Sequence, residues 1–399
     1  MLVASALFAS ASLVNAADTA TVYNITGATA FRAAAHQAII NLLGGPGVAQ
    51  YAYVGSNLNS SNRALFKRTV VTNVPNPGDT ATTIVRTSQG GSTQGILDLA
   101  DQTTTVSYLK TTETVSTGGT VNPGLAGNRE NGTPRFAFSD VDKLLSARPN
   151  STIQGEGVGV VPFMFIAGES APAAVNNMTD QLHESLWASG ELPASMFTGN
   201  PANSGFTLLA TGRNDGSGTR AAVLSETQYG AFRSVIQFNQ TFSGTPATGT
   251  LTGTPTAYAP SGNGGGTSNS NVRDLLVRPS AAGYLGGQYA FVSYLTISDA
   301  VAATGYDQAT GLTTLPSEGA KPMTYNGVRY SEQNVNNGSY TLWSYQQFYR
   351  ASDATGAENT FATDLKNAID SILTPDIGLK TSELNVERTG GDGGPVAPL

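Results

Sequence analysis

GRNDGSGTR, at residues 212–220, is the stretch around which the chain is organised. It follows FTLLA at 206–210, which predicts a buried strand, and precedes AAVLSE at 221–226, which predicts the start of a helix. A glycine-bearing turn that opens a helix presents backbone N–H groups and the positive end of the helix dipole to an anion. Ser217 and Thr219 add hydroxyl donors, and Arg213 adds a guanidinium suited to a tetrahedral oxyanion. The stretch therefore predicts an anion site, although the same residues also suit an ordinary solvated turn.

The composition narrows the class of protein. Of 399 residues, 39% are hydrophobic and only 12% are charged, which suits two or three domain-sized units and an extracytoplasmic location. The net charge of −7 argues against a nucleic-acid partner or an anionic membrane surface. With no Cys and two His, disulfides, thiol catalysis and Cys- or His-rich metal sites are excluded, and we expect neither a metal nor a cofactor. A calcium loop at 215–226 is excluded because its sixth position is Arg220 rather than Gly.

The N-terminus predicts export. Residues 1–17 contain an apolar run and a small-x-small sequence at 14–16, like the core and cleavage site of a secretory signal peptide. The basic segment that usually precedes such a core is missing, so a frayed apolar helix is the alternative. No later run approaches 18 apolar residues. We therefore expect a periplasmic or secreted monomer with no membrane span in the mature chain.

The junction at 212–220 is one of four places where a predicted strand runs into a predicted helix. The other three carry a hydroxyl at the same point: Thr29, Ser92 with Thr93, and Ser139, which Asp140 follows. Alternating strands and helices predict an α/β fold with mixed, mostly parallel sheets flanked by helices. In such sheets ligands bind at the carboxyl ends of the strands, against helix N-termini. The four junctions therefore predict one convergent site.

The remaining segments give coarser expectations. The further predicted strands are 21–25, 50–54, 68–74, 83–87, 158–167, 289–295 and 341–345, and the predicted helices are 32–43, 178–197, 271–278 and 360–373. Residues 103–121 and 237–266 read as hairpin insertions, and the tail from Thr389 on reads as loose. We expect His36, and His183 with Trp187, to serve packing rather than chemistry.

Four motifs, preserved in order, resemble those of type 2 periplasmic solute-binding proteins. TGATAF at 26–31, QGGSTQGI at 89–96, AFSD at 137–140 and RNDGSGT at 213–219 are most similar to the phosphate-binding component of phosphate ABC transporters; GYL at 283–285 and GSYTLW at 338–343 match weaker landmarks. The chain departs from the family by Ala30, an extra residue in the first motif, and by a serine that follows the glycines in the second. Either Ser92 or Ser88 therefore matches the family's serine.

The resemblance implies a two-lobed fold joined by two hinge crossovers, near Pro162 and Gly338. Residues 18–157 and 341–399 would form the first lobe, and residues 158–340 the second. The insertions at 103–134 and 237–266 would enlarge the two lobes.

The resemblance also implies a set of ligand-binding residues. Arg213 would form a charge-assisted pair with the anion, Asp215 would orient that arginine, and Asp140 would accept the proton of a protonated phosphate. Sulfate carries no proton at neutral pH, so burying it against a carboxylate would cost several kcal/mol. Asp140 could equally serve as a helix N-cap. The implied donors to the anion are Thr29, Phe31, Ser92, Thr93, Ser139, Ser217, Gly218 and Thr219.

The sequence thus favours a protein that binds phosphate or a similar oxyanion for ABC-type uptake or sensing, with a transporter permease as a possible partner, and not an enzyme. One alternative is a surface or matrix protein that keeps the fold without transport. Another is a serine hydrolase or phosphatase with Ser217 as nucleophile, but the Gly-x-Ser-x-Gly elbow is missing and neither histidine is near Ser217 in sequence.

Overall fold

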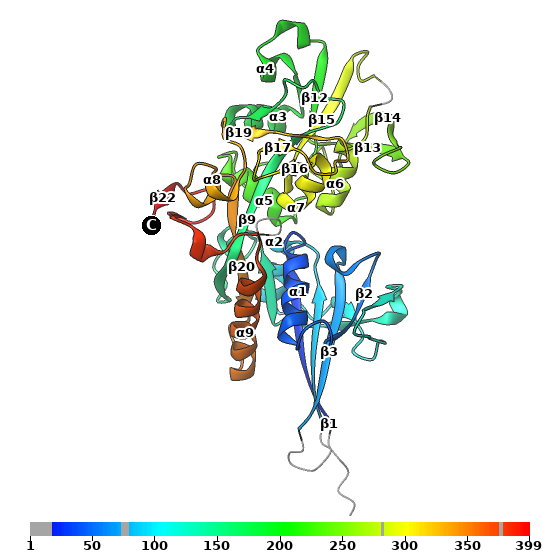
Figure 1. Ribbon diagram of the computed structural model, residues 1–399, viewed down its shortest axis with the longest axis vertical. Helices are drawn as coiled ribbons and strands as arrows, with labels where there is room; N and C mark the ends of the chain where they lie inside the picture. Colours follow the sequence, from blue (N-terminus) through cyan, green and yellow to red (C-terminus); the bar gives the residue numbers. More distant parts are fainter. Residues whose placement is uncertain (1–17, 73–79, 281–282, 375–377) are drawn as a thin grey trace, which may run out of the picture.

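The computed structural model describes residues 18–72, 80–280, 283–374 and 378–399. The predicted signal peptide, residues 1–17, lies outside these ranges. The described chain is an α/β fold built on a 12-stranded sheet, with helices packed against it (Figure 1). None of its described helices is long and apolar enough to cross a membrane.

One long strand, β9 (Gln154–Ala167), joins the two parts of the sheet. Residues 154–162 pair with β20 (Trp343–Arg350), and residues 163–167 pair with β15 (Gln288–Thr296). The strand order is β11-β12-β15-β9-β20-β8-β1-β4-β3-β2-β6. The other strands are β11 (Glu191–Pro193), β12 (Phe206–Ala210), β8 (Phe136–Ser139), β1 (Asp18–Gly27), β4 (Thr80–Ser88), β3 (Arg63–Val71), β2 (Gln50–Val54) and β6 (Thr120–Asn122). Strands on the β1 side lie in the lower part of Figure 1, and β12 and β15 in the upper part.

The sheet is mixed, and the expectation of mostly parallel sheets is wrong. Among the described strands β1 pairs in parallel with β4 and β8, β12 with β15, and β2 with β6. The remaining pairings of the large sheet are antiparallel. The reason is that β2, β3 and β4 follow one another along the chain and also pair side by side, and strands joined by a direct return are antiparallel.

Helices cover both faces of the lower part of the sheet. Phe136 of β8 faces α9 (Gly356–Ile372), where its ring lies 5.2 Å from that of Phe361. The next residue, Ala137, points to the other face and packs with Ile96 and Leu99 of α2 (Ser92–Ala100). Helix α1 (Arg32–Leu42) lies beside α9, on the face of Phe136 (Figure 1). Strand β8 is thus buried on both sides, as parallel α/β strands are.

The upper part contains α3 (Asp180–Ser189), α4 (Ser195–Thr198), α5 (Gly218–Glu226), α6 (Asn269–Leu276), α7 (Ile297–Thr304) and α8 (Glu332–Asn336). The helix expected at 178–197 is interrupted because Gly190 takes a left-handed conformation, after which β11 begins. The ring of His183 stacks on that of Trp187 at 4.4 Å, so the expected packing role is confirmed.

Of the two expected hairpin insertions, one is confirmed. Strands β13 (Phe238–Ser243) and β14 (Thr250–Ala257) form an antiparallel pair. Residues 103–121 do not pair with each other as expected. Instead β5 (Val106–Leu109) pairs with β7 (Arg129–Gly132), and β6 joins the edge of the large sheet beside β2. Small two-stranded sheets complete the upper part: β10 (Asn177–Met178) with β19 (Thr324–Tyr325), and β16 (Tyr306–Asp307) with β17 (Leu312–Thr313), while β18 (Lys321–Pro322) pairs with β9.

The expectation of a loose C-terminal tail is wrong. Strands β21 (Val386–Arg388) and β22 (Val396–Pro398) form what we call the C-terminal hairpin. Arg388 Nη1 lies 2.6 Å from Oε2 of Glu226, the last residue of α5, and both side chains are buried. Asp392, between the two strands, accepts a hydrogen bond from the backbone N–H of Asp142, which follows β8. The glycines of this segment suggest mobility, but its charged side chains anchor it.

Candidate functional site

The structure brings together side chains from all four predicted strand–helix junctions. Thr219 Oγ1 donates to Asp140 Oδ2 at 3.1 Å, and the backbone N–H of Asp140 donates to Ser92 Oγ at 3.1 Å. Arg213 Nη2 donates to Thr29 Oγ1 at 3.3 Å. All five side chains are buried. Residues between 29 and 219 in the sequence therefore form one cluster, which includes the N-terminal ends of α2 and α5, helices that lie near the middle of Figure 1.

The N-terminal ends of α2 and α5 approach each other closely in this cluster. A Cβ atom added to Gly218 would lie only 2.2 Å from Ser92 Oγ. Gly91 has a φ of +133°, and a Cβ there would lie 2.5 Å from the carbonyl oxygen of Gly216. Thr93 Oγ1 donates to that same oxygen at 2.9 Å. The first N–H groups of each helix have no partner within their own helix, so two sets of donors open toward one point.

The carboxylate of Asp140 has an unusual environment within the cluster. Its side chain is buried, and Oδ1 has no hydrogen-bond partner among the described residues. Burial raises the pKa of Asp140 to about 6, against the opposing effects of Arg213, Thr219 and Ser92. A buried acceptor without a partner costs about 1–3 kcal/mol. The site therefore has an acceptor that a proton-bearing ligand would satisfy.

The structure also shows that Asp140 is not a helix N-cap. No α-helix begins there, so the helix expected after Ser139 is wrong. The chain makes a short 3₁₀ turn, η3 (Lys143–Leu145), and Asp142 caps it by accepting from the N–H of Leu144 at 2.9 Å. Asp140 lies two residues before the capping position.

Arg213 is the buried cation of the cluster. Its Nε donates to the carbonyl oxygen of Gly266 at 3.1 Å, Nη1 to Oδ1 of Asn269 at 3.2 Å, and Nη2 to the carbonyl oxygen of Thr267 at 3.1 Å. Burial lowers the pKa of Arg213 to about 10, so the guanidinium is still protonated at neutral pH. Asp140 acts in the opposite direction and favours the charged form.

The structure places Asp215 away from its expected role. Its side chain is exposed and lines an outer groove of about 430 Å³, together with Thr93, Gly216 and Phe232. The expectation that Asp215 orients Arg213 is therefore wrong, because the turn carries the carboxylate outward while the arginine turns inward. Asn269, at the start of α6, makes that contact instead. This contact was not predicted, because the helix was expected to begin at residue 271. Ser268, which caps α6, could have indicated the earlier start.

The other predicted ligand residues have local partners. Ser217 Oγ accepts from the N–H of Arg220 at 3.4 Å and so caps α5. The Ser139 hydroxyl donates to the carbonyl oxygen of Val141 at 2.7 Å, within its own loop. The ring of Phe31, just before α1, packs at 5.7 Å from that of Phe138. Between the two candidate serines, Ser92 lies at the helix start in the cluster, whereas Ser88 ends β4.

Neither histidine is hydrogen-bonded to Ser217 in the described part of the chain. His36 is buried, and its ring nitrogens pair with the carbonyl oxygen of Leu58 and with Thr87 Oγ1. Burial lowers the pKa of His36 to about 4 and that of His183 to about 3. Both rings therefore stay neutral at pH 7 inside packed regions, away from the hydroxyl that a hydrolase would need to activate.

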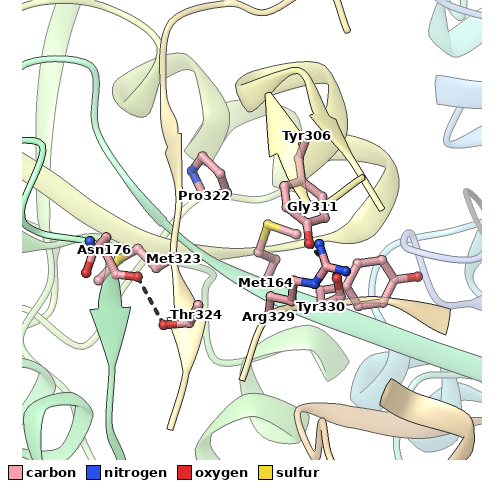
Figure 2. A pocket seen from close by; sticks show the side chains of 9 residues that line it. All are labelled: Met164, Asn176, Tyr306, Gly311, Pro322, Met323, Thr324, Arg329 and Tyr330. Atoms are coloured by element: carbon pink, nitrogen blue, oxygen red, sulfur yellow. Dashed lines mark hydrogen bonds between the residues drawn. The ribbon is translucent and has the colours of Figure 1, made fainter. Parts of the chain in front are cut away.

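A second cavity, of about 240 Å³, lies in the upper part of the molecule (Figure 2). Met164, Met323, Tyr306, Tyr330 and Arg329 contribute to its wall, and no predicted ligand residue does. Nη1 of Arg329 donates to the carbonyl oxygen of Thr310 at 2.8 Å. None of the residues of the buried cluster lines this cavity.

Comparison with solved structures identifies the fold. A protein from Clostridium perfringens, described as a candidate phosphate ABC transporter substrate-binding protein and solved with bound phosphate, matches with a TM-score of 0.50. The match has 12% identity and covers 90% of this chain and 100% of that one. An ABC-type phosphate transport receptor from Vibrio cholerae (12% identity, 86% and 93% covered) and PstS from Borrelia burgdorferi (12%, 90% and 99%) both have a TM-score of 0.43.

Neither a comparison with protein-family models nor one with the sequences of curated proteins gives a match. At this level of identity the likeness concerns the fold alone. The structural neighbours of the chain are substrate-binding proteins of phosphate ABC transporters, as the four motifs predicted.

Proposed function

We propose that this chain is an exported solute-binding protein that captures phosphate or a similar tetrahedral oxyanion, for uptake through an ABC-type permease or for sensing. The observation that carries the proposal is the buried cluster in which Asp140 Oδ1 lacks a partner among the described residues, while hydroxyls, helix N-termini and Arg213 belong to the same cluster. An anion that brings its own proton would satisfy this oxygen and accept from the donors.

Specificity follows from the same carboxylate. A phosphate oxygen that carries a proton donates to Asp140, whereas every oxygen of sulfate at neutral pH repels it. In a buried site, leaving the carboxylate unpaired beside a second anion costs several kcal/mol. The protein would therefore bind phosphate and arsenate, and reject sulfate.

We propose that the ligand is held between two lobes, residues 18–157 with 341–399 and residues 158–340. The change of partner along β9, from β20 before Pro162 to β15 after it, supports a crossover at that point. Thr29, Ser92 and Asp140 come from the first lobe, and Arg213 and Thr219 from the second. Bending at β9 and before β20 would separate these groups and admit the anion.

Titration calorimetry with phosphate, arsenate and sulfate tests the proposal. We expect binding of the first two and at least about a hundredfold weaker binding of sulfate, a difference of about 2.7 kcal/mol. Asp140→Asn should lose most of this discrimination, while the matched variant Asp215→Asn, in the exposed part of the same site loop, should behave as the wild type.

The absence of oxyanion binding in the wild type would overturn the proposal. Equal affinities for phosphate and sulfate would leave the binding function but remove the role of Asp140. Permease genes beside the gene for this chain would favour uptake over a surface protein that has kept the fold without transport.

A further inference from the structure

The guanidinium of Arg213 is held only by neutral groups. Its acceptors are two backbone carbonyls, of Gly266 and Thr267, the amide oxygen of Asn269 and the hydroxyl of Thr29. None of the ion pairs among the described residues involves Arg213. A buried guanidinium is usually compensated by a carboxylate, so its neutral surroundings call for a reason.

Asn269 is fixed in the orientation that this contact requires. Its side chain is buried, and its Nδ2 donates to Thr296 Oγ1 at 2.9 Å. With the amide nitrogen occupied in this way, Oδ1 faces Nη1 of Arg213. The residue therefore sets the plane of the guanidinium without adding charge.

Few charged groups surround Arg213. Asp140 and Asp299 favour its charged form, as does Tyr294, and Arg32 disfavours it. Asp299, on α7, is already paired with Arg273 at 2.9 Å. Arg32, on α1, favours the charged form of Asp299 and disfavours that of Arg213. Asp140 is thus the main counter-charge, and it is the group that the ligand's proton would meet. Since Arg213 forms no direct ion pair among the described residues, its guanidinium can still attract a bound anion.

We propose that Asn269 is the positioning residue of Arg213, and that by orienting the guanidinium without neutralising it Asn269 makes the site select the doubly charged form of phosphate over the singly charged form. This inference rests on the proposed function. Attraction to a fixed charge doubles when the ligand charge doubles, so a guanidinium without a direct ion pair favours the dianion most.

The hydrogen bonds of the cluster also favour the doubly charged form of phosphate. Thr29 Oγ1 already accepts a bond, so its hydroxyl has its proton left to donate. Asp140 Oδ1 is the acceptor without a partner in the described cluster. One carboxylate oxygen matches a ligand that carries one proton, which is the dianion; the singly charged form carries two.

Calorimetry with inorganic phosphate between pH 5.5 and pH 8.5 tests this inference on the whole chain. We expect the wild-type affinity to rise about tenfold over this range, equivalent to about 1.4 kcal/mol. Asn269→Asp should weaken binding at pH 8 by about tenfold or more and abolish the rise, because its carboxylate cancels the guanidinium charge. Asn269→Ala should weaken binding at every pH and keep the rise, and Asp215→Asn should match the wild type.

A purely structural role for Asn269 would not change the pH profile. A wild-type affinity that does not rise with pH, or an Asn269→Asp variant with the wild-type profile, would overturn the inference while the proposed function stands.

The melting temperature without ligand gives an independent measurement: we expect Asn269→Ala to lower it and Asn269→Asp to keep or raise it. Should the wild type bind no oxyanion, the proposed function fails, and the selection of the dianion is overturned with it. The melting temperatures then still decide whether Asn269 holds Arg213: equal values for the two variants would overturn that role, and the expected split would support it.

Discussion

The two ends of helix α5 use the same residue types in opposite ways. At its N-terminal end lie a buried aspartate, Asp140, and a buried arginine, Arg213. At its C-terminal end lie a buried glutamate, Glu226, and a buried arginine, Arg388. Each pair combines one carboxylate with one guanidinium in a region closed to water.

The difference is in the pairing. At the C-terminal end Arg388 touches Glu226 at 2.6 Å, donates to the carbonyl oxygens of Trp343 and Gly394, and lies 4.3 Å above the ring of Trp343. At the N-terminal end the two charges are held apart by neutral partners, and one carboxylate oxygen is left unpaired among the described residues. One end joins its two charges directly, whereas the other keeps them apart, as the proposed oxyanion site requires.

Breaking the paired end should have the largest effect. Arg388→Met leaves Glu226 buried without its cation, which costs about 3–5 kcal/mol in unfolding free energy. Burial raises the pKa of Glu226 to about 8 although Arg388 opposes this shift. The folded state thus holds the proton more tightly than the unfolded state, so stability falls as the pH rises from about 4.5 toward 8. Without Arg388 this pKa rises further, so denaturant unfolding should show a larger difference between variant and wild type at pH 8 than at pH 5.

The matched control for this variant is Arg233→Met. Arg233 pairs with Glu184 at 2.9 Å, but both side chains are more than half exposed, so we expect a loss below about 1 kcal/mol. Equal losses in the two variants would contradict the assignment of the C-terminal hairpin as an anchor.

Neutralising Asp140, at the N-terminal end of α5, should change the stability in the opposite direction. Because burial raises the pKa of Asp140 from 3.8 to about 6, the ionised carboxylate costs the folded state up to about 3 kcal/mol above that pH. Asp140→Asn should therefore melt at a higher temperature than the wild type at pH 8 without phosphate. Near pH 4, where both proteins carry a neutral group, the difference should shrink. A less stable variant at pH 8 would contradict the comparison.

A smaller effect is expected from crowding the contact between α2 and α5. In Gly218→Ala the new methyl group meets Ser92 Oγ, so the two helix ends must separate, at a cost of about 1–2 kcal/mol. We expect phosphate affinity to fall about tenfold or more with the fold intact. Gly216→Ala is the control, since no atom lies within 4 Å of its added Cβ. Calorimetry and circular dichroism on both variants would separate crowding from misfolding.

Local patterns predicted the elements well where the fold is locally determined. The runs at 50–54 and 206–210 are strands with the expected ends, because turn residues bracket short apolar segments. The junctions of Thr29, Ser92 and Asp140 converge because they follow β1, β4 and β8, and β1 pairs in parallel with both β4 and β8.

Features that depend on distant partners escaped the sequence analysis. The C-terminal hairpin looked mobile because its anchor, Glu226, is far away along the chain. Asn269 likewise reaches Arg213 from another loop, whereas the nearby Asp215 looked like the natural partner and faces solvent instead. Spacing in the sequence predicts contacts within a turn and says little about contacts between loops.

Strand β20 has a consequence for how the chain folds. It lies between β8 and β9, yet Ser344, which donates to the backbone of Asp140, follows that residue by 204 positions. Closing such a long loop is entropically costly and gives the fold a high contact order. A nascent chain that ends before Trp343 exposes the edges of β8 and β9, whose apolar strands invite association with other chains. Completion of the fold must therefore wait until nearly the whole chain has been synthesised.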